Sequence, residues 1–267
     1  MRLPVALTIA GSDSGGGAGI QADIKTFYAC GVHGACAITS ITSQNTVGVI
    51  SRFDLPVQVV VSQLGAVLDD FAVGGAKTGM LASAAIIRAV AEVVAERGVE
   101  RLVVDPVAVS TSGHSLLDGG GIETIAETLF PLATMITPNL TEASLLLDLE
   151  IASMESMKRA AALLKDMGPA CVLLKGGHLA ACDQAVDIFY DGADLAVLTA
   201  PRIDTENTHG TGCMLSAAAA AYLAMGEAPL RAASRAKQDV TRALVNSLDI
   251  GRGRGPVHPI PEPGLES

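Results

Sequence analysis

A glycine-rich turn ahead of an apolar helix is the most chemically suggestive segment of this sequence. Gly210, Thr211 and Gly212 precede Cys213 and an alanine-rich stretch. Glycines let consecutive backbone N–H groups converge, and the N-terminal end of a helix attracts negative charge. Such a turn can hold an oxyanion, for example a phosphoryl group during its transfer.

Cys213 follows this turn directly, and its side chain could accept a proton. Thiols at helix N-termini have lowered pKa values, and we expect a lowered pKa for Cys213. A base beside an oxyanion hole could take the proton of an acceptor hydroxyl. Cysteine is also among the residues most often buried for packing, so position alone leaves both interpretations open.

A second group of polar residues lies at the ends of other predicted strands. Asp105 ends one apolar run, and Asn139 and Glu142 stand three apart at a predicted helix start. Together they could hold Mg²⁺ through waters against phosphate oxygens. Taken alone, Asn139 and Glu142 are more typical of helix capping. Lys175, at the end of a further run, could neutralise a nucleotide phosphate, although a lysine there is usually solvated.

Two common phosphate-binding motifs do not account for the first glycine cluster. The segment from Gly17 to Ala22 fits the dinucleotide pattern GxGxxA after a predicted strand. That pattern also needs an acidic residue about twenty positions on, and none occurs between Asp23 and Asp54. The P-loop pattern GxxxxGK[ST] occurs nowhere in the chain. Phosphate binding here would therefore use a different arrangement.

Strand-length apolar runs alternate with segments of helical period along most of the chain. The predicted strands are 5–10, 35–41, 72–78, 101–105, 134–137 and 170–175, and the predicted helices are 18–29, 56–71, 83–97, 121–130, 141–147, 153–167, 212–225 and 229–248. This order predicts one α/β domain over residues 1–267, with a mainly parallel sheet covered on both faces. Segments 185–190 and 195–199 flank Asp191-Gly192, which predicts an antiparallel hairpin at one edge. We expect 251–267, rich in Gly and Pro, to form an irregular tail.

Composition narrows the class of partner. The chain has 267 residues, 49% of them apolar, which is enough for one large core. A net charge of −10 without a basic run argues against nucleic acid and membrane partners and favours a small-molecule substrate. Five cysteines, an odd number, predict reduced thiols and a cytoplasmic protein.

Seven ordered segments, taken together, carry a family resemblance. They are Gly11 to Asp23, Thr39 to Thr46, Lys77 to Leu81, Asp105 to Val107, Thr137 to Glu142, Lys175 to His178 and His209 to Cys213. These segments resemble those of the hydroxymethylpyrimidine/phosphomethylpyrimidine kinases of thiamine biosynthesis, in the ribokinase-like superfamily. The resemblance implies a three-layer α/β/α fold and ATP-dependent phosphorylation of 4-amino-5-hydroxymethyl-2-methylpyrimidine, first to the monophosphate and then to the diphosphate. It also implies Mg²⁺ as cofactor and a homodimer, because dimers are frequent in that superfamily.

The resemblance assigns roles to individual residues. Gln44 would hold the pyrimidine ring, because its amide offers a donor and an acceptor to the ring nitrogen and the exocyclic amine. The other implied residues are Asp23 near the hydroxymethyl group; Gly11, Met80 and Val107 around the ring; Gly210, Thr211, Gly212 and Cys213 as anion hole and base; Lys175, Asn139 and Thr211 at the nucleotide; and Asp105 and Glu142 at the metal.

Three other functions stay open at this level. One is a pyridoxal kinase of the same branch, and another is an enzyme that phosphorylates only the monophosphate. The third is a ligand-binding module without turnover. The presence of Asp105, Glu142, Lys175 and Cys213 argues against that third function, because mere binding would not require them.

Overall fold

A single nine-stranded sheet runs through the computed structural model, which describes residues 3–108, 117, 120–177, 179 and 183–261. In space the strands follow the order β3-β2-β1-β4-β5-β6-β7-β8-β9. Their bounds are β1 Val5–Asp13, β2 His33–Gln44, β3 Val49–Asp54, β4 Val73–Thr78, β5 Leu102–Val104, β6 Met135–Ile136, β7 Cys171–Lys175, β8 Gln184–Tyr190 and β9 Leu195–Pro201. The six predicted strands and the predicted hairpin all correspond to strands of this sheet.

The two edges of the sheet are antiparallel, and the six strands between them are parallel. The β8–β9 hairpin forms one edge, as the Asp191-Gly192 signal predicted. The other edge is β3, which pairs antiparallel with β2 and which the sequence analysis missed. The predicted antiparallel edge hairpin is therefore confirmed, and β3 adds a second antiparallel edge that was not predicted. Both faces of β3 are largely exposed, so its residues carry no strong apolar alternation.

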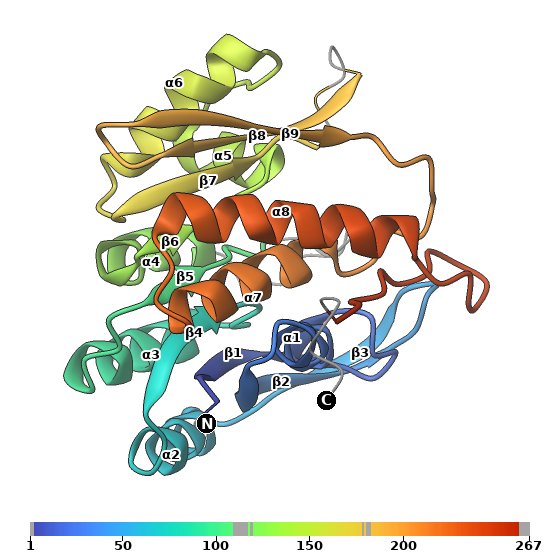
Figure 1. The fold of residues 1–267 in the computed structure, drawn as a ribbon. Helices are drawn as coiled ribbons and strands as arrows, with labels where there is room; N and C mark the ends of the chain where they lie inside the picture. The colour runs from blue at the N-terminus through green and yellow to red at the C-terminus, as the bar shows by residue number, and fades with distance from the viewer. Residues whose placement is uncertain (1–2, 109–116, 118–119, 178, 180–182, 262–267) are drawn as a thin grey trace.

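Helices cover both faces of the sheet (Figure 1). One face carries α1 Gly19–Ala29, α7 Thr211–Ala224 and α8 Pro229–Val245; the other carries α2 Val57–Leu68, α3 Ala84–Glu96, α4 Gly121–Thr128, the short 3-10 helix η1 Phe130–Leu132, α5 Leu140–Leu147 and α6 Met154–Lys165. The predicted three-layer α/β/α architecture is confirmed. The predicted helices differ from these mainly by one to three residues at their ends.

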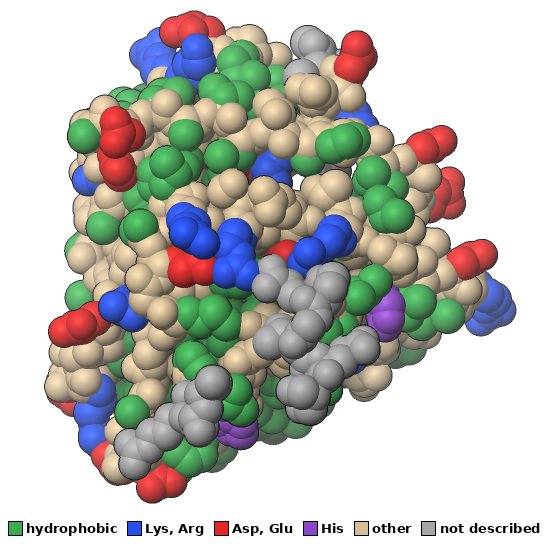
Figure 2. All heavy atoms as spheres, viewed as in Figure 1, with side chains coloured by type: hydrophobic (Ala, Val, Ile, Leu, Met, Phe, Trp, Pro, Cys, Tyr) green, Lys and Arg blue, Asp and Glu red, His purple; other side chains and the backbone are tan. Residues whose placement is uncertain are grey.

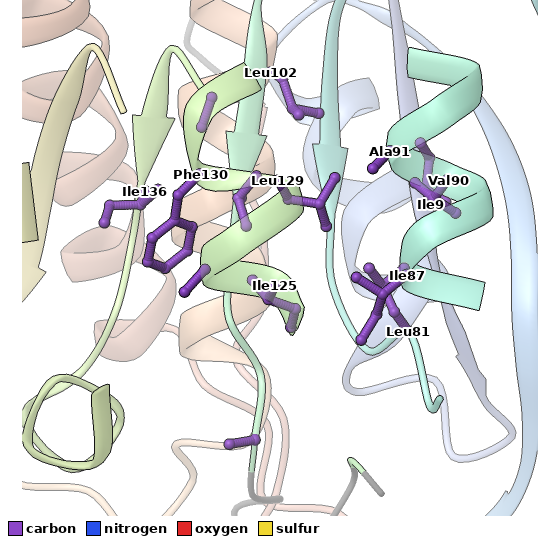
Figure 3. Close-up of a cluster of buried hydrophobic side chains, with 14 of the residues drawn as sticks. Ile9, Leu81, Ile87, Val90, Ala91, Leu102, Ile125, Leu129, Phe130 and Ile136 are labelled. Atoms are coloured by element: carbon purple, nitrogen blue, oxygen red, sulfur yellow. The ribbon is translucent and has the colours of Figure 1, made fainter. Parts of the chain in front are cut away.

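Each face has its own apolar core. Figure 3 shows the larger one, in which side chains of α3 and α4, such as Ile87 and Ile125, cluster with strand residues such as Ile9. On the opposite face, α7 is buried all round between the sheet and α8. Its alanines permit close approach, and a side chain at Gly75 of β4 would come within 2.7 Å of the Ala220 carbonyl oxygen. This tight packing fixes the place of the N-terminal end of α7.

The outer surface of α8 is charged. Basic and acidic side chains lie side by side there (Figure 2), including the Arg242–Asp239 ion pair. Arg235 also pairs with Glu227 and lies 3.9 Å from the centre of the Tyr222 ring. Within the described ranges, none of the helices combines the length and apolar character needed to cross a bilayer.

The segment after α8 is held against the body of the protein. The Arg254 N–H donates to the Thr46 carbonyl, and the N–H of Val257 donates to the carbonyl of His209. The N–H of His209 in turn donates to the Gly255 carbonyl. Residues 254–257 belong to no helix or named strand, but these long-range backbone hydrogen bonds hold them in place.

Candidate functional site

The carboxyl ends of the parallel strands meet at one edge of the sheet. There β1 leads into the glycine turn 14–18, β4 into Gly79, and β7 ends at Lys175. From β1 the chain goes first to β2 on one side and later to β4 on the other. Open parallel sheets bind ligands at such a switch point. The N-terminal end of α7 packs over the same strands, so the predicted site residues converge here.

The anion-hole turn depends on two glycine segments in contact. Gly210, the N-cap of α7, has a φ of +85°, and a Cβ there would lie 1.9 Å from the Gly17 carbonyl oxygen. A side chain at Gly210 is thus excluded by both backbone strain and space. Because α7 begins at Thr211, the N–H groups of Gly212 and Cys213 have no carbonyl within the helix to bond. They are available for an anion.

Asp105 and Lys175 form an ion pair beside this turn. The Lys175 Nζ lies 2.8 Å from Oδ1 of Asp105, and a Cβ at Gly212 would lie 3.5 Å from the same Nζ. Thr137 and Ser216 donate to the two oxygens of Asp105 at 3.0 and 3.2 Å. Burial alone would lower the pKa of Lys175, but the Asp105 and Glu142 carboxylates outweigh it and hold that pKa above its usual value. The sequence had left open that Lys175 is simply exposed to solvent, and this ion pair excludes that alternative.

Asn139 and Glu142 cap α5 and also border the ion pair. The Glu142 N–H donates to Asn139 Oδ1 at 2.9 Å, and the Asn139 N–H donates to Glu142 Oε2 at 2.8 Å. The capping role is thus confirmed. Burial, opposed by Lys175 and assisted by the Asp105 charge, raises the pKa of Glu142 to about 7. While it caps the helix, the Glu142 carboxyl group still lies near Asp105. Capping therefore does not preclude a second role in holding a metal ion.

Cys213 corrects the sequence-based expectation of a lowered thiol pKa. Burial raises the pKa of this thiol to about 11, although the charge of Lys77 acts in the opposite direction. The Asp23 and Asp105 carboxylates raise it further. A helix N-terminus does lower the pKa of a thiol. Here the loss of solvation and two nearby negative charges raise the pKa by more than the helix lowers it, and neither can be read from the sequence.

Asp23 lies beneath the site instead of lining it. Both its carboxylate and the Lys77 side chain are fully buried, and the Lys77 Nζ lies 3.0 and 2.9 Å from the two oxygens. The Thr8 hydroxyl donates to Asp23 at 2.6 Å. Burial would lower the pKa of Lys77, but Asp23 outweighs it and holds that pKa above its ordinary value. The family resemblance implied that Asp23 contacts an acceptor hydroxyl. The Asp23 side chain has no exposed atom that could make this contact.

Gln44, Gly11, Met80 and Val107 come from the ends of four neighbouring strands, β2, β1, β4 and β5. Met80 and Val107 belong to one apolar cluster, and a Cβ at Gly11 would meet the Met80 methyl at 3.2 Å. The Gln44 amide is within reach of Thr42 and His209. Gly11, Met80 and Val107 therefore form an apolar surface, and Gln44 ends the neighbouring strand β2. An apolar surface with an amide on the next strand suits a flat ring that carries polar groups.

Asp13 and His209, for which no role was predicted from the sequence, lie in the same place. Asp13 Oδ2 lies 2.9 Å from His209 Nε2, across 196 residues of sequence. The neighbouring glycines were the only feature of the sequence that could have indicated this pair. Each residue stands in a glycine-rich segment, and the two segments are in contact in the structure. Nothing in the local pattern could have paired them.

A cavity of about 330 Å³ lies between β9 and α8. Its lining includes Val197, Leu198, Thr199, Pro201, Lys237 and Gln238. Lys237 pairs with Asp187 at 2.7 Å, and Asp187 accepts from the N–H of Gly176, the residue after Lys175. The cavity is thus joined to the Lys175 end of the site through one ion pair.

Comparisons with known proteins agree with this arrangement. The chain is 47% identical to the hydroxymethylpyrimidine/phosphomethylpyrimidine kinase of Synechococcus elongatus, over 96% of this chain and 97% of that protein. Among solved structures, an ADP complex of Bacillus subtilis pyridoxal kinase superposes with a TM-score of 0.89, at 38% identity over 97% of this chain and 98% of that one. The phosphomethylpyrimidine kinase of Clostridium difficile superposes with a TM-score of 0.81, at 40% identity over 91% and 100%. The model of the phosphomethylpyrimidine kinase family matches residues 13–258, and the chain belongs to that family.

Proposed function

We propose that this protein uses ATP to phosphorylate 4-amino-5-hydroxymethyl-2-methylpyrimidine, and then phosphorylates the monophosphate to the diphosphate. One observation carries the proposal: the anion-hole turn of α7 directly follows His209, which is within reach of the Gln44 amide, and its Gly212 lies beside the Lys175–Asp105 pair. A phosphoryl group held at Gly212 and Cys213 is then between an acceptor and a nucleotide. The names of the relatives support the same acceptor.

At the acceptor end, Gln44 pairs with the ring nitrogen and the exocyclic amine. Met80 and Val107 pack against the ring, and Gly11 leaves room for it. Asp23 acts from below the site, by holding Lys77 in place near Cys213. An amide with one donor and one acceptor is the complement of an aminopyrimidine edge.

At the nucleotide end, Lys175, Thr211 and Asn139 face the phosphates, and the cavity beside Lys237 receives the base. The ADP complex of the pyridoxal kinase supports a nucleotide on this fold. Asp105 and Glu142 fit Mg²⁺ because two buried carboxylates share one lysine, which leaves them an excess negative charge. No group of three acidic, histidine or cysteine side chains placed to hold a metal ion by themselves occurs in the described part of the chain. This matches a cation that takes one or two carboxylates and completes its shell with phosphate oxygens and water.

In the transfer step, the acceptor oxygen forms a bond to the γ-phosphorus while the bond from that phosphorus to the ADP oxygen breaks. The hydroxyl proton goes to the thiolate form of Cys213, which becomes a thiol. The N–H groups of Gly212 and Cys213 and the Lys175 ammonium stabilise the negative charge of the phosphoryl group in flight. Bound Mg²⁺ supplies further neutralisation of phosphate charge. The second transfer uses the same residues with the monophosphate as acceptor.

The pH dependence of kcat tests the role of Cys213. With a thiol pKa of about 11, the thiolate fraction rises about tenfold for each pH unit between pH 7 and 9. We expect kcat to rise by a similar factor over that range. In Cys213→Asp the carboxylate is already ionised at pH 7, so its kcat is lower but nearly constant. A flat profile for the natural enzyme would contradict proton transfer to this thiol.

An acceptor comparison tests the proposed function. Purified protein is incubated with ATP and Mg²⁺ and with hydroxymethylpyrimidine, its monophosphate or pyridoxal, and products are followed by mass spectrometry. We expect both pyrimidines to be phosphorylated, with a higher kcat/KM than pyridoxal. Product from pyridoxal alone would make this a pyridoxal kinase, and product from the monophosphate alone would make it a one-step enzyme.

A homodimer is the proposed assembly, formed through the edge strand β3. Ile41 of β2 and Phe53 of β3 are paired across the strands and are 48% and 64% exposed. Val47 and Ile50 nearby are exposed as well. An apolar edge strand is a template for pairing with a second copy. We expect sedimentation equilibrium to give twice the chain mass for the natural protein and the chain mass for Phe53→Lys, with Tyr28→Lys on α1 as a control that stays dimeric.

A further inference from the structure

Two aspartates flank Lys175 within the sheet. On one side, the Lys175 Nζ lies 2.8 Å from Oδ1 of Asp105. On the other side, Asp187 of β8 stands directly opposite Lys175 in the antiparallel β7–β8 ladder. Residues opposite each other in such a ladder project from the same face of the sheet, with Cβ atoms about 4.5–5.5 Å apart, a gap that a lysine side chain can span. Lys175 therefore has two carboxylates that it could pair with.

Asp187 is buried, and a partner occupies each of its oxygens. Its Oδ2 lies 2.7 Å from Nζ of Lys237, which is buried on α8, and its Oδ1 accepts from the Gly176 N–H at 3.0 Å. Two opposite charges this close cancel much of each other's field. Asp187 is thus left with little charge to attract Lys175, and Lys175 pairs with Asp105.

The backbone around Lys175 is held independently of Lys237. Lys175 is paired with a neighbouring segment of chain on both sides. Beyond the strand, the Arg202 guanidinium donates to the carbonyls of Gly177 and Leu179 at 2.8 and 2.7 Å. Loss of the Lys237 charge would therefore change which carboxylate attracts Lys175 while these contacts keep the end of β7 in place.

We propose that Lys237 is a positioning residue, which neutralises Asp187 and thereby keeps the Lys175 ammonium at Asp105, beside the anion-hole turn. This inference rests on the proposed function, in which Lys175 neutralises the phosphoryl group during transfer. Without Lys237, Asp187 is a buried carboxylate that has lost its cation, a state of high energy. Lys175, directly across the ladder, relieves that state by turning toward β8, and the phosphoryl group loses its stabilising charge.

Kinetics of three variants separate this role from that of a merely structural ion pair. In Lys237→Met we expect kcat to fall about 10–100-fold, because displacing Lys175 forfeits part of the stabilisation that a donor gives to the reacting group. Asp187→Asn should keep kcat within about threefold, since its amide oxygen still accepts from Gly176 and no competing charge remains. The double variant Lys237→Met/Asp187→Asn should recover most of the loss. The pyrimidine KM should change by less than about twofold throughout, because Gln44 is remote from this pair.

The pattern across the variants decides the matter. Equal losses of kcat in the two single variants would mean that the ion pair serves only the fold. A double variant as slow as Lys237→Met would mean that Lys237 acts on the nucleotide directly, and either result would overturn the inference. Lys158→Met is the same substitution in an exposed pair on α6 and should leave kcat within about twofold.

Urea unfolding of each variant checks that it is folded under the assay conditions. If Lys237→Met does not fold, Lys237→Gln takes its place with the same expected order of kcat values. Glutamine removes the charge at this position and keeps an N–H that can donate to Asp187.

The position of Lys175 can be observed without any acceptor. A crystal structure of Lys237→Met should show the Lys175 ammonium within ion-pair distance of Asp187 and separated from Asp105. Lys175 still paired with Asp105 in that variant would overturn the inference. If the natural enzyme phosphorylated neither pyrimidine, the proposed function would fail, and this structure would still decide whether Lys237 controls the position of Lys175.

Discussion

Replacing Cys213 with alanine is expected to lower kcat by about 10²–10⁴, which is the usual contribution of a positioned general base. Both substrates should still bind. The anion-hole N–H groups belong to the backbone, and Gln44 lies on strand β2, whereas Cys213 lies on helix α7. Rapid-quench measurement of the first turnover would give the rate of transfer, and equilibrium dialysis would give the affinity for the pyrimidine.

Cys36 provides a matched control for this prediction. It is a partly buried thiol on β2, away from α7, and Cys36→Ala should leave the transfer rate within about twofold, since surface and half-buried thiols away from a site have no role in proton transfer. A Cys213→Ala enzyme that turned over at the natural rate would remove the thiol from the mechanism and leave positioning and charge as the whole of catalysis.

Replacing Lys77 with methionine is expected to destabilise the fold by about 3–5 kcal/mol, because it leaves the Asp23 charge buried without its partner. Both side chains are fully buried. The double variant Lys77→Met/Asp23→Leu removes both charges and should regain most of that loss. Urea unfolding measures the free energy of unfolding of each variant.

The Lys158–Glu155 pair offers a control on the surface. Its side chains are 38% and 88% exposed and 3.8 Å apart, so Lys158→Met should change the free energy of unfolding by less than about 1 kcal/mol. A loss in Lys77→Met no larger than this would show that Asp23 and Lys77 are not an isolated buried pair.

Most elements of the fold were predictable because their signals are local. The apolar runs that became β1 and β4 are bounded by glycines, and the alanine-rich segment 214–221 gave a helix in its predicted place. Strand β3 was missed because both of its faces are largely exposed, so it lacks the apolar period that marks the other strands. The predicted helix ends differ from the observed ones by a residue or so at caps such as Ser83 and Asn139. Each of these residues is the N-cap, so the helix begins at the residue after it.

The site was predictable only as far as residue types indicate chemistry. Asp105, Lys175 and the Gly210 turn do lie together, because strand ends and a helix start meet at one edge. The roles of Asp23 and the thiol pKa of Cys213 were not predictable, since they depend on burial and on Lys77, which is 54 residues from Asp23. The Asp13–His209 pair depends on an even longer separation.

The central claim is that one anion hole serves two successive phosphoryl transfers to the same pyrimidine. The most direct test is a time course of mono- and diphosphate from hydroxymethylpyrimidine and ATP, for the natural enzyme and for Cys213→Ala. The account predicts that the monophosphate rises and then falls as the diphosphate accumulates, and that the variant loses both steps together. Monophosphate that accumulates without diphosphate, or a variant that loses only one step, would contradict it.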